Sequence, residues 1–192
     1  MTSFAIVGHL ARTDGSFSLN DLPGSGGRMD ILCRCVNAGL FLSHDLRRDV
    51  DCYLVLLGAP SGPKTVKFSG SSVRSLSPDE RSAGALIRKV IDVPCGSEFR
   101  EGAEGVSIRK GGLERLLSEQ PFAVLDETGT DIRTVQDLSG AYLLSDHMNF
   151  TEAENELIRG CPRLSVGPKC LHADHTITVL HNELDRRMSG WR

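Results

Sequence analysis

"SVGPKCLHADHTITVLHNELD", residues 165–185, joins a Gly-Pro turn, a polar loop with closely spaced histidines and the start of a helical pattern. Apolar side chains recur at helical spacing in its second half, so we expect a final helix over 172–188. The short apolar segment just before the turn, 163–168, is typical of a strand. The stretch therefore predicts that the chain closes with a strand, a polar loop and a helix.

The same alternation of strands and helices runs through the rest of the chain. Ser77, followed by Glu80, predicts the first turn of a helix over 75–91, because this spacing forms a capping box. The segment 64–70 is typical of an edge strand or a hairpin arm. We expect further strands at 4–8, 52–58, 105–110, 121–129 and 141–147, and further helices at 29–42, 112–120 and 151–160. This order predicts an α/β fold, with a mainly parallel sheet and helices on both faces, in one domain over 1–192.

Composition and charge exclude several classes of protein. The chain has 192 residues, of which 40% are hydrophobic and 24% charged, as expected of a globular core. The net charge of −3 means that any nucleic acid must be bound by a local basic patch. No apolar run reaches the ~18 residues of a membrane helix, and the N-terminus lacks a secretory signal, so we expect a cytoplasmic protein. The six cysteines form no C-x-x-C pair and are expected to be reduced and buried.

Polar or glycine-containing loops follow three of the expected strands. They are Leu125–Glu127, Ser145–His147 and Val166–Pro168. In parallel sheets, ligands bind outside the carboxyl ends of the strands, so these loops are expected to converge on one pocket. The phosphate-binding pattern G-x-G-x-x-G, the P-loop and the G-x-S-x-G elbow are missing from the sequence, which argues against dinucleotide, nucleoside triphosphate and serine hydrolase chemistry.

The histidines of the opening stretch allow two interpretations. His172 and His175 could share a helical face and bind a metal together with Asp146 and His147, but no H-E-x-x-H motif or Cys/His quartet accompanies them. Alternatively, the first two histidines open the last helix and His181 packs against neighbouring elements. We favour the second interpretation and expect no metal.

Four blocks of the sequence resemble one enzyme family along nearly the whole chain. They are "DLPGSGGRMDILCRCV", "SHDLRRDV", "SPDERSAGALIRKV" and the opening stretch. They are similar to the archaeal tRNA pseudouridine-54 N1-methyltransferases, which are SPOUT proteins with a C-terminal trefoil knot. The resemblance implies a homodimeric enzyme that transfers a methyl group from S-adenosylmethionine to N1 of pseudouridine 54 in the TΨC arm of tRNA.

The resemblance also implies where the cofactor binds. It would lie between the loops that follow the last three strands, in contact with Leu125, Ser145, Val166, Gly167, Pro168, Leu171 and Thr176. Two of these positions depart from the family pattern: Ser145 stands where a glycine is common, and Thr176 where a cysteine is common.

Methylation at N1 releases a proton, and RNA binding requires positive charge. The expected proton acceptors are Asp30, which follows the glycine-rich loop 13–28, and Asp146 or His147 at the pocket. A basic face for phosphate contacts is expected from Arg28, Arg34, Arg47, Arg48, Arg74 and Arg81. Three alternatives stay open: a SPOUT methyltransferase for a different RNA site, a SPOUT-fold RNA-binding protein without activity, and a zinc hydrolase.

Overall fold

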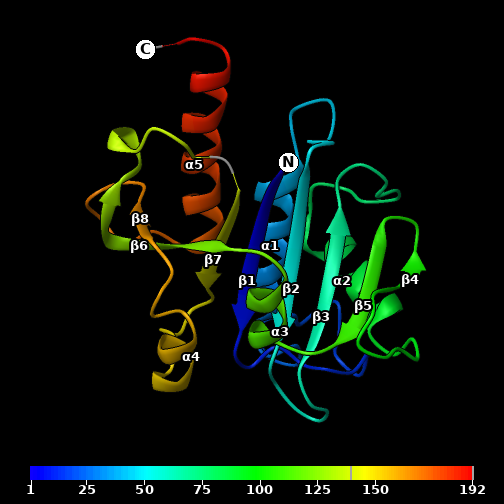
Figure 1. The fold of residues 1–192 in the computed structure, drawn as a ribbon. Helices are drawn as coiled ribbons and strands as arrows, with labels where there is room; N and C mark the ends of the chain where they lie inside the picture. Colours follow the sequence, from blue (N-terminus) through cyan, green and yellow to red (C-terminus); the bar gives the residue numbers. More distant parts are fainter. Residues whose placement is uncertain (139, 192) are drawn as a thin grey trace.

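The computed structural model describes residues 1–138 and 140–191, and its elements are arranged around one eight-stranded sheet (Figure 1). In sheet order the strands are β4 (Arg100–Ala103), β5 (Val106–Lys110), β3 (Lys64–Ser69), β2 (Val50–Leu56), β1 (Thr2–Gly8), β7 (Ala141–Ser145), β6 (Phe122–Asp131) and β8 (Arg163–Ser165).

The sheet has a parallel part and an antiparallel part. Strands β2, β1, β7, β6 and β8 run parallel, whereas β3, β5 and β4 continue from β2 as antiparallel neighbours. The predicted mainly parallel sheet is confirmed. The segment 64–70 is a hairpin arm, but β5 pairs with its other side, so an edge strand was the wrong alternative. The edge strand of the antiparallel part is β4, which was not predicted from the sequence.

Strand β1 lies in the middle of the sheet and is buried on both faces. Phe4 and Ile6 belong to the core on one face, and Ala5 and Val7 to the core on the other. Because successive side chains of a strand point to opposite faces, this continuous apolar run is what a central parallel strand requires.

Helices cover both faces, as predicted. Leu113, Leu116 and Ile158 pack with Ala5 and Val7 on one face, and the larger core of the other face includes α1, α2 and α5. The helices are α1 (Met29–Leu40), α2 (Glu80–Val90), α3 (Leu113–Glu119), α4 (Glu152–Leu157) and α5 (Ala173–Met188), with a short 3-10 helix, η1, at Ile132–Thr134. In the part of the chain described, no helix is long and apolar enough to cross a membrane.

Two helix starts show how well local capping signals predict structure. Helix α4 begins after Thr151, which forms a full capping box with Glu154, so this start is as the sequence predicts. Helix α2 begins later than expected: its N-cap is Asp79, whose side chain accepts a hydrogen bond of 2.8 Å from the backbone of Ser82. Ser77 was therefore the wrong N-cap, because the side chain of Asp79, two residues later, binds the free backbone amide of Ser82 in the first helical turn.

The strands of the single sheet come from Thr2 to Ser165. The one-domain organisation of 1–192 stays a prediction. Residues 139 and 192 lie outside the described part. The trefoil knot stays a prediction.

Candidate functional site

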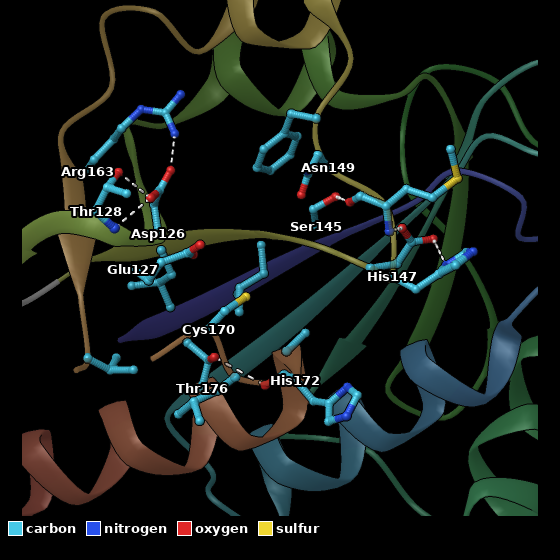
Figure 2. Close-up of a pocket in the computed structure, with 18 of the residues that line it drawn as sticks. Asp126, Glu127, Thr128, Ser145, His147, Asn149, Arg163, Cys170, His172 and Thr176 are labelled. Atoms are coloured by element: carbon cyan, nitrogen blue, oxygen red, sulfur yellow. Dashed lines mark hydrogen bonds and ion pairs between the residues drawn. The ribbon is translucent and has the colours of Figure 1, made fainter. Parts of the chain in front are cut away.

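A cavity of about 630 Å³ lies at the carboxyl ends of β7 and β8, against the middle of β6, and beside the first turn of α5. Its lining comes from 125–128, 144–150 and 169–173, with Val166, Gly167, Thr176, Asn155 and Arg163. Figure 2 shows these side chains around the cavity, with Asp126 and Arg163 on one side and His147 on the other. The three segments expected to converge do so at one edge of the parallel part of the sheet. Ser145–His147 and Val166–Pro168 lie where β7 and β8 end, whereas Leu125–Glu127 lies within β6, so the loop expected there was wrong.

Most of the residues expected to contact a cofactor line this cavity. They are Leu125, Ser145, Val166, Gly167, Leu171 and Thr176. Pro168 is not among the lining residues, although it lies between Gly167 and Lys169, which are. A Cβ at Gly167 would meet no other atom within 4 Å, so this position leaves open space next to the cavity.

One side of the cavity carries a fixed negative charge. The carboxylate of Asp126 accepts hydrogen bonds from the backbone nitrogen and hydroxyl of Thr128, at 2.8 and 2.6 Å, and pairs with the guanidinium of Arg163. Burial would raise the pKa of the Asp126 carboxyl, but these hydrogen bonds outweigh it and hold the pKa below its usual range. The neighbouring Glu127 raises the pKa of the Cys170 thiol, chiefly by its charge.

The two departures from the family pattern do not leave unpartnered groups in the cavity. The hydroxyl of Ser145 donates to the backbone oxygen of Met148, and that of Thr176 donates to the backbone oxygen of His172 at 3.1 Å. Each hydroxyl is therefore satisfied within its own loop or helix turn, which limits how far it perturbs the cavity.

Asp146 and His147 form the wall of the cavity that follows β7. The carboxylate of Asp146 is fully buried and receives hydrogen bonds from the backbone and ring of His9 and from the backbone of Met148. His147 is 29% exposed, and its Nδ1 lies 3.3 Å from the second oxygen of Asp146. Asp146 is thus held inside the wall, whereas the side chain of His147 is the more exposed of the two.

Asp30 is brought to a different environment. Its carboxylate is bound by Arg28, at 3.0 and 3.1 Å, and by Arg34 at 3.0 Å, and it is not among the cavity residues. Burial acts to raise the pKa of Asp30, but the two guanidinium groups lower it overall. A carboxylate held as an anion between two arginines is a poor proton acceptor.

The six arginines proposed for RNA do not form one face. Arg28, Arg34 and Arg81 lie at the N-terminal end of α1 and on α2, where Arg34 also contacts Glu80. Arg47, Arg48 and Arg74 lie beyond the other end of α1: Arg47 forms a two-bonded ion pair with Asp185 of α5, Arg48 donates to the backbone of Gly70, and Arg74 pairs with Glu104. The expected grouping is therefore split in two.

The histidines of the opening stretch serve α5 and its packing. His172 is the N-cap residue, without a side-chain cap, and its ring lies edge-on to that of His175. His181 is buried against Phe4, with its Nε2 3.0 Å from the backbone oxygen of Gly39. Within 1–138 and 140–191, no group of three or more His, Cys, Asp or Glu side chains is arranged to hold a metal ion.

Sequence reasoning missed two residues that shape the cavity wall, His9 and Glu154. His9 directly follows β1, so the rule that selected the other loops, polar residues at the carboxyl end of a parallel strand, also applied to it. Glu154 lies in the helix expected over 151–160, but it was given no role at the cavity.

The comparisons with known proteins agree with this geometry. Residues 1–189 match the family model described as "Putative SAM-dependent RNA methyltransferase". A tRNA (pseudouridine(54)-N(1))-methyltransferase of Methanocorpusculum labreanum is 56% identical over 191 residues, covering 97% of this chain and 98% of that protein. The enzyme of the same name from Methanospirillum hungatei is 53% identical over 193 residues, covering 100% of both.

A solved structure supports the fold independently of sequence. Archaeoglobus fulgidus Nep1 bound to S-adenosylhomocysteine superposes with a TM-score of 0.69 at 14% identity, covering 98% of this chain and 99% of that one. At this low identity the similarity concerns the fold alone.

Proposed function

The chain belongs to the family of SAM-dependent RNA methyltransferases, and from that premise we propose that it methylates N1 of pseudouridine 54 in tRNA. It is an enzyme, and S-adenosylmethionine is its methyl donor. The observation that carries the proposal is the cavity beside β6 and at the carboxyl ends of β7 and β8, whose size and lining suit this donor.

The residues present fit the cofactor in size and charge. A volume of about 630 Å³ is within the usual range for small-molecule sites. Gly167 leaves room beside the loops, and Glu127, unlike Asp126, is not paired with Arg163, so its carboxylate favours a positively charged ligand. The cofactor supplies an electrophilic methyl group on a sulfonium, and the chain's residues bind it and position the base.

His147 is the proposed proton acceptor. N1 of pseudouridine forms a bond to the methyl carbon as the carbon–sulfur bond breaks, and the N1 proton must leave. Asp146 faces Nδ1 of His147 and favours the tautomer that carries its proton there, so Nε2 is free to accept. Asp146 acts as the residue that orients this ring, and Asp30 as the residue that holds Arg28 and Arg34.

RNA contacts are proposed at the N-terminal end of α1. Arg28 is near enough to Asp146 for the two charges to interact, so this end lies beside the cavity wall. Arg34 and Arg81 extend the same end toward α2. Phosphate contacts there would position the TΨC arm of the tRNA. Arg47, Arg48 and Arg74 lie beyond the other end of α1 and do not share that surface.

We also propose that the chain works in the cytoplasm as a homodimer with a knotted C-terminal half. The proposal of a dimer rests on the resemblance. Ile177 and Leu180 of the apolar last helix are buried within the chain, so they cannot contact a second copy. Val179 and Met188 are exposed apolar residues of that helix that are available to a second copy. Light scattering of the purified protein measures the state directly.

The decisive test compares two tRNA substrates. The protein is incubated with S-adenosylmethionine and tRNA that carries either pseudouridine or uridine at position 54, and nucleosides are analysed by mass spectrometry. We expect N1-methylpseudouridine from the first substrate and no product from the second. Methylation of a different nucleotide would assign the enzyme to another RNA site. If neither tRNA is methylated in the presence of S-adenosylmethionine, the result would favour an RNA-binding protein without activity.

A further inference from the structure

The side chain of His9 is almost buried behind the cavity wall, and no step proposed so far uses it. It follows β1, and its side chain is 6% exposed. His9 does not line the cavity. Its ring lies between the carboxylates of Asp146, which is 0% exposed, and Glu154, which is 11% exposed.

Both ring nitrogens face an acceptor. Nδ1 is 2.9 Å from Oδ1 of Asp146, and Nε2 is 3.0 Å from Oε2 of Glu154. The backbone nitrogen of His9 donates to the other oxygen of Asp146 at 3.0 Å. Carboxylates only accept when ionised, so both nitrogens must donate, and the ring is an imidazolium. Burial acts to lower the pKa of His9, but the hydrogen bonds and charges of the two carboxylates raise it overall.

The two carboxylates in turn fix both ends of one segment. Asp146 accepts from the backbone of Met148 at 2.9 Å, and its own backbone nitrogen donates to Val7 at 3.0 Å. Glu154 accepts from the backbone and hydroxyl of Thr151, at 2.7 and 2.9 Å. Between these two anchors runs the wall 145–150, every residue of which lines the cavity.

We infer that His9 is a positioning residue whose imidazolium ring holds the wall 145–150 in the shape that binds the cofactor. This inference rests on the proposed function of the cavity. Without the ring, two buried carboxylates would face each other across the space it leaves. Repulsion and lost hydrogen bonds would then move the segment or force one carboxyl to take up a proton. Arg28, the cation whose charge also acts on Asp146, is not among the groups that act on Glu154, which are His9 and Thr151.

The test pairs His9→Leu with His181→Leu. Both variants remove a buried histidine that has a hydrogen-bond partner, but His181 contacts Gly39 and Phe4 rather than the wall. S-adenosylhomocysteine binding is measured by calorimetry at a temperature where both variants are folded. We expect the affinity of His9→Leu for S-adenosylhomocysteine to fall about tenfold or more, because small displacements of the groups that position a ligand weaken its binding strongly. His181→Leu should stay within about threefold of wild type, since distant sites act independently.

Hydrogen exchange provides a second readout, which needs no cofactor. Amides of 145–150 should exchange faster in His9→Leu than in wild type, and at the wild-type rate in His181→Leu. If His9→Leu does not fold, His9→Gln and His9→Asn replace it, because each keeps one of the two donors and should lose less affinity than full removal.

Equal binding by the His9 variants and the wild type would overturn the inference while leaving the proposed function intact. Equal weakening in His9→Leu and His181→Leu would also overturn it, because the cause would then be general destabilisation. A wild-type protein that binds no S-adenosylhomocysteine is a different result and would overturn the proposed function itself.

Discussion

His181 should make the stability of the fold depend on pH in the acidic range. Its side chain packs edge-on against Phe4 and is only 5% exposed. Burial, and secondly the charge of Arg47, lowers its pKa from 6.5 to about 4, against the smaller opposing effects of Gly39, Asp185 and Asp49. Between these two values the unfolded chain binds a proton that the folded chain does not. Acid therefore favours unfolding in this range.

The size of the effect follows from the two pKa values. A tenfold change in an acid dissociation constant corresponds to about 1.4 kcal/mol, so lowering the pKa from 6.5 to about 4 contributes about 3 kcal/mol. This stability is fully present above the unfolded pKa and is lost as the pH falls toward about 4. It is a large part of the roughly 5 to 15 kcal/mol that stabilises a typical domain.

The assay is urea unfolding of wild type and His181→Gln at about pH 7.5 and about pH 4. The glutamine amide can still donate to Gly39 but cannot titrate, so the variant should lose about 3 kcal/mol less on acidification than wild type. Other titrating groups are common to both proteins and cancel in the difference. Equal losses in the two proteins would show that the His181 ring takes up its proton in the folded state, which would refute the reasoning.

Three further results are expected. Gly167→Leu should leave the unfolding temperature unchanged, because a side chain there meets open space, but should abolish S-adenosylmethionine binding in calorimetry; unchanged affinity would remove Gly167 from the site. Arg47→Ala should lower the melting temperature by roughly 5 °C, because it loses its ion pair with Asp185 of α5. Arg81→Ala should leave the melting temperature unchanged and reduce the salt dependence of tRNA binding by about one ion. A reduced salt dependence in Arg47→Ala but not in Arg81→Ala would place RNA at the other end of α1. Iodoacetamide should label the exposed Cys170 before the buried cysteines, and S-adenosylhomocysteine should slow that labelling; equal labelling with and without the ligand would count against a cofactor beside Cys170.

The parallel core and the position of the cavity could be predicted from sequence because both follow from local patterns. Continuous apolar runs such as 52–58 identify buried strands, and the polar residues that follow such strands identify the edge where ligands bind. The pattern failed at β4, which has only one apolar residue in four and pairs along a single edge. Short exposed strands are defined by their partner, which the local sequence does not contain.

The charged residues were harder to predict because their environment is tertiary. Asp30 was expected to accept a proton, yet it is buried and bound by two arginines. His9 meets Asp146 and Glu154, partners that lie 137 and 145 residues away. No spacing in the sequence indicates such a pair, so the role of His9 is visible only in the folded chain.

The central place of β1 has a consequence for how the protein is made. Strand β1 needs β7 as one of its two neighbours, and β7 ends more than 130 residues later, at Ser145. Until β7 has been made, one side of a largely apolar strand has no partner and is open to mispairing with other chains. The cavity wall depends on the same late segment, so a nascent chain cannot acquire its binding site piece by piece. Competence to bind a ligand therefore arrives only after β7, β8 and the start of α5 have been made.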